Sequence, residues 1–278
     1  MSDETLVLLD GLMFPEAPRW RDGWLWFTDQ HARRVARVDL QGRVETLIEM
    51  DDLPGGLGWL PDGRLLVVAM TQRRVYRLEG RRLLLHADLS GLASWHCNDM
   101  LVNARGQAYV GNFGFDLHGG APLAPAELVR VEPDGSSRVV ARDLIFPNGA
   151  VISADGRSLI LAETFAARLT AFELDVKGEL GERRLWADLG DAHPDGICLD
   201  AAGAIWVAAP NLGELLRVEE GGRVSWRIRS RGAPYACALG GDRGCSLFIC
   251  SSESDDPAEA CRRRSGRIET VQVAVAGW

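Results

Sequence analysis

A short motif recurs six times along the chain, and it constrains the fold more than any other feature. Each copy has a proline or cysteine, then one variable residue, which we call the slot, then in most copies a small residue. A glycine-bearing turn follows the slot after seven to nine residues. The spacings between successive slots are 39, 43, 50, 47 and 40 residues, which indicates a repeat architecture. The slot residues are Glu16, Gly55, Asn98, Asn148, Asp195 and Tyr235.

Each repeat predicts four short strands separated by turn residues. In the first repeat these strands are expected at 16–20, 24–28, 34–39 and 44–48. Such a succession is typical of an antiparallel meander. No segment sustains a helical period, so we expect an all-β protein.

The two ends of the chain predict how the repeats close. A strand at 6–9 precedes the first slot, whereas the sixth repeat supplies only three strands and ends at 266–273. The first strand should therefore complete the last sheet and close a six-bladed β-propeller with four antiparallel strands per blade. We expect residues 1–278 to form this one domain. An open sandwich or a solenoid would not need a circularly shifted repeat, and the Gly-His and Trp-Asp pairs of WD40 propellers do not recur.

Composition and charge narrow the classes of partner. The chain is 46% hydrophobic and 25% charged, so it can bury a large core. A net charge of −8 disfavours nucleic-acid and anionic-membrane surfaces, and we predict that 262–264, three consecutive arginines, form a solvated loop. No secretory signal or membrane span is recognised, and the six cysteines contain no CxxC pair. We therefore expect a cytoplasmic protein with free thiols, without membrane or nucleic-acid partners, and in an oligomeric state that the sequence leaves open.

The repeat geometry predicts a site. If each slot begins the innermost strand of its blade, six slots meet around the central channel, and small residues after them allow the backbones to approach closely. Only Asp99 departs from that rule. Two carboxylates, two amides and a phenol would then face one another. Because two buried carboxylates repel, a cation or a proton must compensate them.

Two interpretations of this site remain open. In the first, Glu16, Asn148 and Asp195 hold one hard divalent cation through oxygen atoms and leave positions for water and substrate. In the second, the same residues form a hydrogen-bonded channel plug with bound water and no metal.

Four stretches resemble the SMP-30/gluconolactonase/luciferin-regenerating enzyme family of six-bladed propellers with a central divalent metal. They are 14–20, 97–99, 147–149 and 193–196, in the family's order. The resemblance implies that Glu16, Asn148 and Asp195 are metal ligands, that Asn98 contacts substrate or water, and that Asp195 is also the general base. It further implies a metal-dependent hydrolase of small-molecule lactones. Calcium is favoured as the metal, with zinc, manganese or magnesium as alternatives.

His96 departs from the family's sugar-lactone pattern, in which this position is an arginine. In a strand, residues i and i+2 share a face, so His96 should point into the same pocket as Asn98. A neutral imidazole is a poorer clamp for several hydroxyl groups than a guanidinium. We therefore expect a substrate other than gluconolactone. His193, two residues before Asp195, is a further candidate for the pocket wall.

Other residues receive structural interpretations. His31, His86 and His118 are expected at turns or on the surface, and Cys97 should point away from the pocket. Asp29 and Glu163 are secondary candidates for the rim of the site. The long loops 114–125 and 251–265 should overhang the channel mouth.

Two function classes other than lactone hydrolysis stay open. One is a non-catalytic, divalent-cation-binding propeller that acts as a regulator or scaffold. The other, which the acidic slot residues disfavour, is a propeller related to strictosidine synthase.

Overall fold

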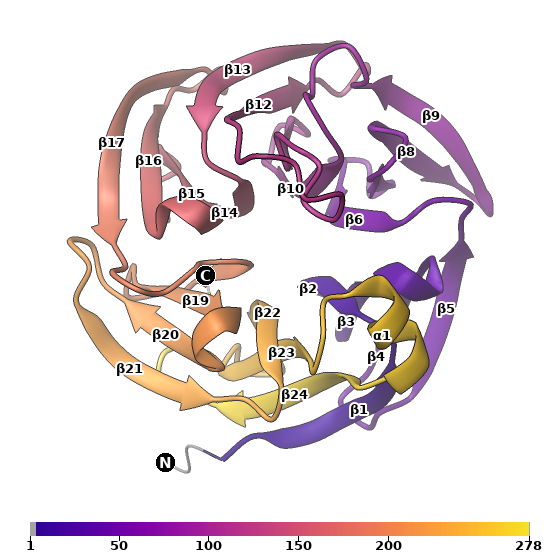
Figure 1. The fold of residues 1–278 in the computed structure, drawn as a ribbon, viewed down its shortest axis with the longest axis vertical. Helices are drawn as coiled ribbons and strands as arrows, with labels where there is room; N and C mark the ends of the chain where they lie inside the picture. The colour runs from indigo at the N-terminus through magenta and orange to yellow at the C-terminus, as the bar shows by residue number, and fades with distance from the viewer. Residues whose placement is uncertain (1–3, 278) are drawn as a thin grey trace.

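The structure is a computed structural model that describes residues 4–277, and it is a ring of six four-stranded antiparallel sheets (Figure 1). In each blade the strand that contains the slot, or directly follows it, lies at the centre of the ring, and the last strand lies at the rim. The predicted six-bladed propeller is therefore confirmed.

The first three blades follow the predicted repeats closely. Blade 1 contains β2 (Pro15–Arg21), β3 (Trp24–Asp29), β4 (Arg34–Val38) and β5 (Val44–Glu49). Blade 2 contains β6 (Pro54–Trp59), β7 (Leu65–Ala69), β8 (Arg74–Glu79) and β9 (Arg82–Asp88). Blade 3 contains β10 (Cys97–Val102), β11 (Ala108–Asn112), β12 (Ala126–Val131) and β13 (Ser137–Leu144).

The other three blades complete the ring. Blade 4 contains β14 (Pro147–Ile152), β15 (Ser158–Glu163), β16 (Arg168–Leu174) and β17 (Leu180–Asp188). Blade 5 contains β18 (Ile197–Leu199), β19 (Ile205–Ala209), β20 (Glu214–Val218) and β21 (Val224–Arg229). Blade 6 contains β22 (Ala233–Gly240), β23 (Ser246–Ser252), β24 (Gly266–Gln272) and β1 (Leu6–Leu12).

The closure of the ring is the one predicted from the two ends. β1 pairs antiparallel with β24, with Leu6 opposite Thr270 and Leu12 opposite Gly266. Next to this pair, the Thr5 hydroxyl donates to the buried Glu269 carboxylate at 2.5 Å. Because the strands at the two ends of the chain share one sheet, the ring has no open blade.

The apolar core is divided among the blade interfaces. Six clusters of buried side chains are found, and each joins two neighbouring blades. Trp206 packs between blades 5 and 6, and Trp26 meets Trp59 edge-on between blades 1 and 2 with 5.4 Å between ring centroids. These large aromatic side chains therefore help to hold neighbouring blades together.

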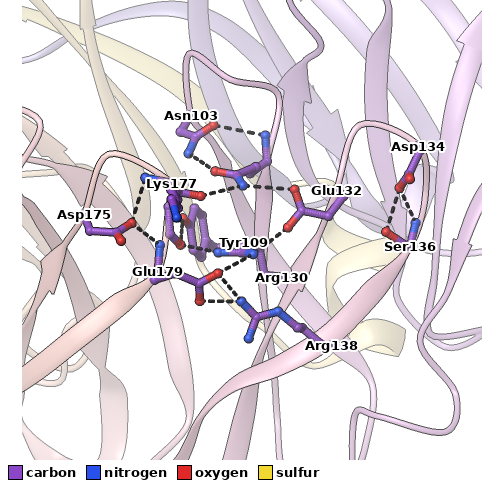
Figure 2. A network of polar contacts seen from close by, with 12 residues as sticks. Asn103, Tyr109, Arg130, Glu132, Asp134, Ser136, Arg138, Asp175, Lys177 and Glu179 are labelled. Carbon is purple, nitrogen blue, oxygen red and sulfur yellow. Dashed lines mark hydrogen bonds and ion pairs between the residues drawn. The ribbon is translucent and has the colours of Figure 1, made fainter.

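Polar contacts add to the interface between blades 3 and 4 (Figure 2). The turn between β16 and β17 presents the Gly178 carbonyl, which accepts from the Tyr109 hydroxyl at 2.7 Å and from Arg130 Nη1 at 2.5 Å. Arg130 also pairs with Glu132 and Glu179 at 2.6 and 3.0 Å. Since Arg130 is buried, these partners compensate its charge.

The inner strands approach so closely that glycine is required directly after two of the slots. A Cβ atom on Gly56 would lie 2.1 Å from the Met100 nitrogen, and one on Gly149 would lie 2.6 Å from the Ile197 nitrogen. The Gly149 N–H instead donates to the Asp195 carbonyl at 3.2 Å. The predicted crowding around the channel is confirmed.

The few helices are short. Three 3₁₀ turns follow second strands, η1 (Gln30–Ala32), η2 (Thr164–Ala166) and η3 (Pro210–Leu212), and α1 (Pro257–Arg263) lies between β23 and β24. Arg262 and Arg263 occupy the last turn of α1, so the predicted loop over 262–264 was wrong, although these residues are exposed. The Asp256 side chain caps the helix by accepting from the Glu259 N–H, a local signal in a segment too short for periodicity to show. Within residues 4–277 no helix has the length and apolarity needed to cross a membrane.

Candidate metal and substrate site

A cavity of about 420 Å³ opens at one mouth of the central channel. Five slot side chains line it, and the sixth slot is Gly55. The predicted convergence of the slots is thus confirmed. The five are Glu16, Asn98, Asn148, Asp195 and Tyr235.

A second tier of lining residues comes directly after the second strand of the blades. Most of this tier was not predicted from the sequence. His31 lies in the 3₁₀ turn η1 and His118 in a turn of the loop at 114–125, as expected, and both also line the cavity. His86 is buried in β9, so its expected place at a turn or on the surface was wrong. The tier contains Gln30, His31, Met70, Phe113, Thr164, Phe165, Pro210 and Asn211.

The two long loops contribute the outer wall, as predicted. Leu117 and His118 come from the loop at 114–125, and Asp255 and Pro257 come from the loop at 251–265. α1 contacts η1, so the second loop lies against the turn that carries His31. Residues far apart in the sequence therefore enclose the space above the slots.

The carboxylates of Glu16 and Asp195 have no cationic partner at the base of the cavity. Burial raises the pKa of Glu16 to about 8, with a smaller contribution from the charge of Asp99. Burial also raises the pKa of Asp195 well above its ordinary value, and the neighbouring Glu16 charge adds to the shift. Within residues 4–277 neither carboxylate forms a salt bridge, because the nearby Arg19 pairs with Asp99. A divalent cation would compensate both charges.

Asn148 lies against Asp195 and is oriented by its neighbours. Its Nδ2 donates to the Thr164 hydroxyl at 3.2 Å, and that hydroxyl donates to the Pro194 carbonyl at 2.8 Å. Across residues 4–277 no group of three or more His, Cys, Asp or Glu side chains could hold a metal ion. A cation at the slots would therefore also draw on neutral oxygen atoms such as that of the Asn148 amide, and such an all-oxygen set suits a hard ion.

The two rim candidates have structural roles instead. Asp29 is buried and accepts from the backbone N–H groups of Met13 and Phe14 at 3.0 and 2.9 Å. Glu163 is buried and accepts from the Ile145 N–H at 2.8 Å and pairs with Arg168. Each carboxylate fixes the loop that leads into the slot of its own blade. Neither lines the cavity, so their prediction as rim residues was wrong.

The neighbours of Asn98 separate as strand alternation predicts. His96 lines the cavity, where its ring lies 5.0 Å from the Trp95 ring, and burial lowers its pKa. Cys97 points into the apolar cluster between blades 2 and 3, and burial raises its pKa to about 12. A thiol with that pKa is a poor nucleophile at neutral pH. His193 also lines the cavity.

Comparison with known proteins gives consistent matches over most of the chain. The SMP-30/Gluconolactonase/LRE-like region model matches residues 14–253. A 6-deoxy-6-sulfogluconolactonase of Pseudomonas putida is 29% identical, covering 99% of this chain and 97% of that protein. A regucalcin of Danio rerio is 25% identical, covering 94% and 90%. The crystal structure of a calcium-binding protein, regucalcin, from Agrobacterium tumefaciens has a TM-score of 0.83 at 23% identity, covering 98% of this chain and 94% of that one.

Proposed function

Because the chain belongs to the SMP-30/gluconolactonase/LRE-like family, we propose that it hydrolyses a lactone at the channel mouth with the help of one divalent cation. The observation that carries this proposal is the pair of half-buried carboxylates of Glu16 and Asp195 at the base of an open cavity, which have no salt-bridge partner among residues 4–277. The relative named as a sulfogluconolactonase supports the reaction class.

Glu16, Asn148 and Asp195 would hold the cation. When bound there, a hard divalent cation such as calcium supplies a Lewis acid for the carbonyl oxygen of the lactone. The regucalcin structure described as a calcium-binding protein supports calcium as the first ion to test. The chain's part would be to keep the two carboxylates close together in a site whose lining, among residues 4–277, contains no lysine or arginine.

Asp195 would also act on the attacking water. Its carboxylate accepts a proton from the water while the water oxygen bonds to the lactone carbonyl carbon. The ring C–O bond then breaks, and the leaving ring oxygen takes up a proton to give a hydroxy acid. The Asn98 amide and the His96 imidazole line the same cavity and would orient the lactone and the water.

The open cavity favours an enzyme over a non-catalytic cation-binding regulator or scaffold. A cation that only stiffened the ring would need no adjacent space, whereas about 420 Å³ lies directly over the slot residues. This volume is within the range of about 300–1,000 Å³ that is usual for small-molecule sites.

The proposed function is tested by acid release from a panel of lactones, followed with a pH indicator. We expect turnover above the spontaneous rate with calcium-loaded protein and its loss after chelation. If calcium-loaded protein hydrolyses none of the sugar, alkyl or aryl lactones, the proposed function is wrong.

A further inference from the structure

The wall above the slots is aromatic on two opposite sides of the ring. Where blades 6 and 1 meet, the Phe14 and Tyr235 rings lie 4.6 Å apart. Where blades 3 and 4 meet, Phe146 lies 4.6 Å from Phe113 and 4.9 Å from Phe165. Since the 6/1 and 3/4 interfaces are three blades apart, the two aromatic groups face each other across the mouth.

The same wall has no fixed positive charge for an anionic molecule, and its donors to hydroxyl groups are neutral side chains such as Gln30, His31 and Asn211. Within the described residues the lining contains no lysine and no arginine. Its charged groups are the carboxylates of Glu16, Asp195 and Asp255. One divalent cation balances two of these three, so no positive charge is left over for a second anionic group on the substrate. Guanidinium groups, which bind hydroxyls and anions through several donors, are missing.

We propose that the substrate is an uncharged lactone that carries an aromatic or branched alkyl substituent, and not a sugar lactone. This inference rests on the proposed function. The lactone carbonyl points down to the slots, and the substituent packs against Phe113, Phe146 and Phe165. Phe165 is 38% exposed, so its ring has free surface for a ligand. Burial of an apolar substituent there stabilises the complex in proportion to the area removed from water.

Binding is tested with lactams, which have the shape of lactones but resist hydrolysis. The probes are the lactam of dihydrocoumarin, gluconolactam and δ-valerolactam, titrated calorimetrically into calcium-loaded protein. We expect the aromatic lactam to bind at least about tenfold more tightly than gluconolactam, which corresponds to a difference of about 1.4 kcal/mol in binding free energy. Equal or tighter binding of gluconolactam would overturn the inference.

Phe165→Ala locates the contact. The variant should bind the aromatic lactam about tenfold more weakly, as expected for loss of an aromatic contact and its buried area, and should bind δ-valerolactam unchanged. The matched control is Trp226→Ala, which removes another ring that is 38% exposed, on the outer strand β21 away from the cavity. An equal loss for both lactams, or no loss for either, would contradict the proposed contact.

The lactones themselves separate this inference from the proposed function. We expect a higher kcat/KM for dihydrocoumarin than for glucono-δ-lactone. A preference for the sugar lactone in turnover and in binding would overturn the inference and leave the hydrolase intact. Absence of all turnover would overturn the hydrolase, while the lactam affinities would still decide which class of molecule the cavity prefers.

Discussion

Arg19 binds Asp99 across the channel, with 2.9 Å between Nη2 and Oδ1, although it lies only three residues after Glu16. Arg19 also donates to the Met100 carbonyl at 2.8 Å. This ion pair joins the inner strands of blades 1 and 3. The inner strand of blade 2, which lies between them in the ring, has glycines at 55 and 56. The ion pair also explains why Asp99 departs from the small residues after the other slots. The guanidinium nearest to Glu16 is therefore committed, and the charge of Glu16 is left for a cation or a proton.

Metal-free protein should lose stability as the pH rises. Glu16 has a pKa of about 8 in the fold and an ordinary value of 4.5, so its contribution to stability is complete below about 4.5 and is lost as the pH passes through 8. Bound calcium would favour the charged form of Glu16 and so offset this loss. The Tm difference between calcium-loaded and metal-free protein should therefore be larger at pH 8.5 than at pH 5.5. Thermal melts check this. An equal difference at both pH values would contradict the account.

Deletion of residues 1–10 should destabilise the whole ring. It removes most of β1 and exposes the edge of β24, and it removes the Thr5 hydroxyl from the buried Glu269. In a chain of this size each kcal/mol lost lowers Tm by about 2–4 °C, so we expect a decrease of about 10 °C in a single transition. Deletion of residues 1–3, which leaves Glu4, Thr5 and β1 in place, is the control. An unchanged Tm for the longer deletion would contradict the role of β1 in closure.

The sequence predicted the ring because each repeat contains its own local signals. Turn glycines, apolar second strands and a strand before the first slot specify the blades and their closure independently of distant contacts. The second strand expected at 24–28, for example, is β3 (Trp24–Asp29). The slot residues could be placed for the same reason, since each occupies a fixed position in its repeat.

The rest of the site depends on loop conformation, which no repeat signal specifies. His31 and Phe165 reach the cavity because η1 and η2 turn the chain inward after a second strand. Asp29 and Glu163, which precede those turns, bind loop N–H groups instead of facing the cavity. From the sequence alone, a carboxylate at the end of a strand could line the cavity or bind loop N–H groups. Only the three-dimensional path of the neighbouring loop distinguishes these two roles.

His96→Arg should change substrate preference. The imidazole lines the cavity beside Trp95, and a guanidinium in its place would offer several donors to hydroxyl groups. We expect the ratio of kcat/KM for glucono-δ-lactone to that for dihydrocoumarin to rise about tenfold, as measured with both substrates at saturating calcium. The control is Arg184→His, a change at an exposed position, which shows the general effect of altered surface charge. His86→Arg would not serve, because His86 is buried. An unchanged ratio in His96→Arg would mean that this side chain does not contact substrate.

Asp195→Asn should remove turnover even when the metal site is full. Loss of a positioned general base costs about 100- to 10,000-fold in kcat. Since the substitution also weakens cation binding, kcat must be compared at calcium concentrations shown by titration to saturate the variant. Asp191→Asn, an exposed neighbour outside the cavity, is the control. Turnover close to that of the unmodified protein would eliminate Asp195 as the base and would direct attention to His96 and His193.

The calcium dependence of lactone hydrolysis in Glu16→Gln tests the central claim most directly. Even residues that only support metal ligands are worth about 10- to 100-fold in affinity, so loss of this carboxylate should raise the calcium concentration for half-maximal turnover by about 100-fold or more. The β-rich fold should remain intact by circular dichroism, and Glu182→Gln, an exposed residue on β17, should behave as the unmodified protein. We predict that chelated protein is inactive, that one calcium per chain restores turnover, and that Glu16→Gln needs far more. Full turnover by chelated protein, or an unchanged calcium requirement in Glu16→Gln, would contradict a cation held between the slots.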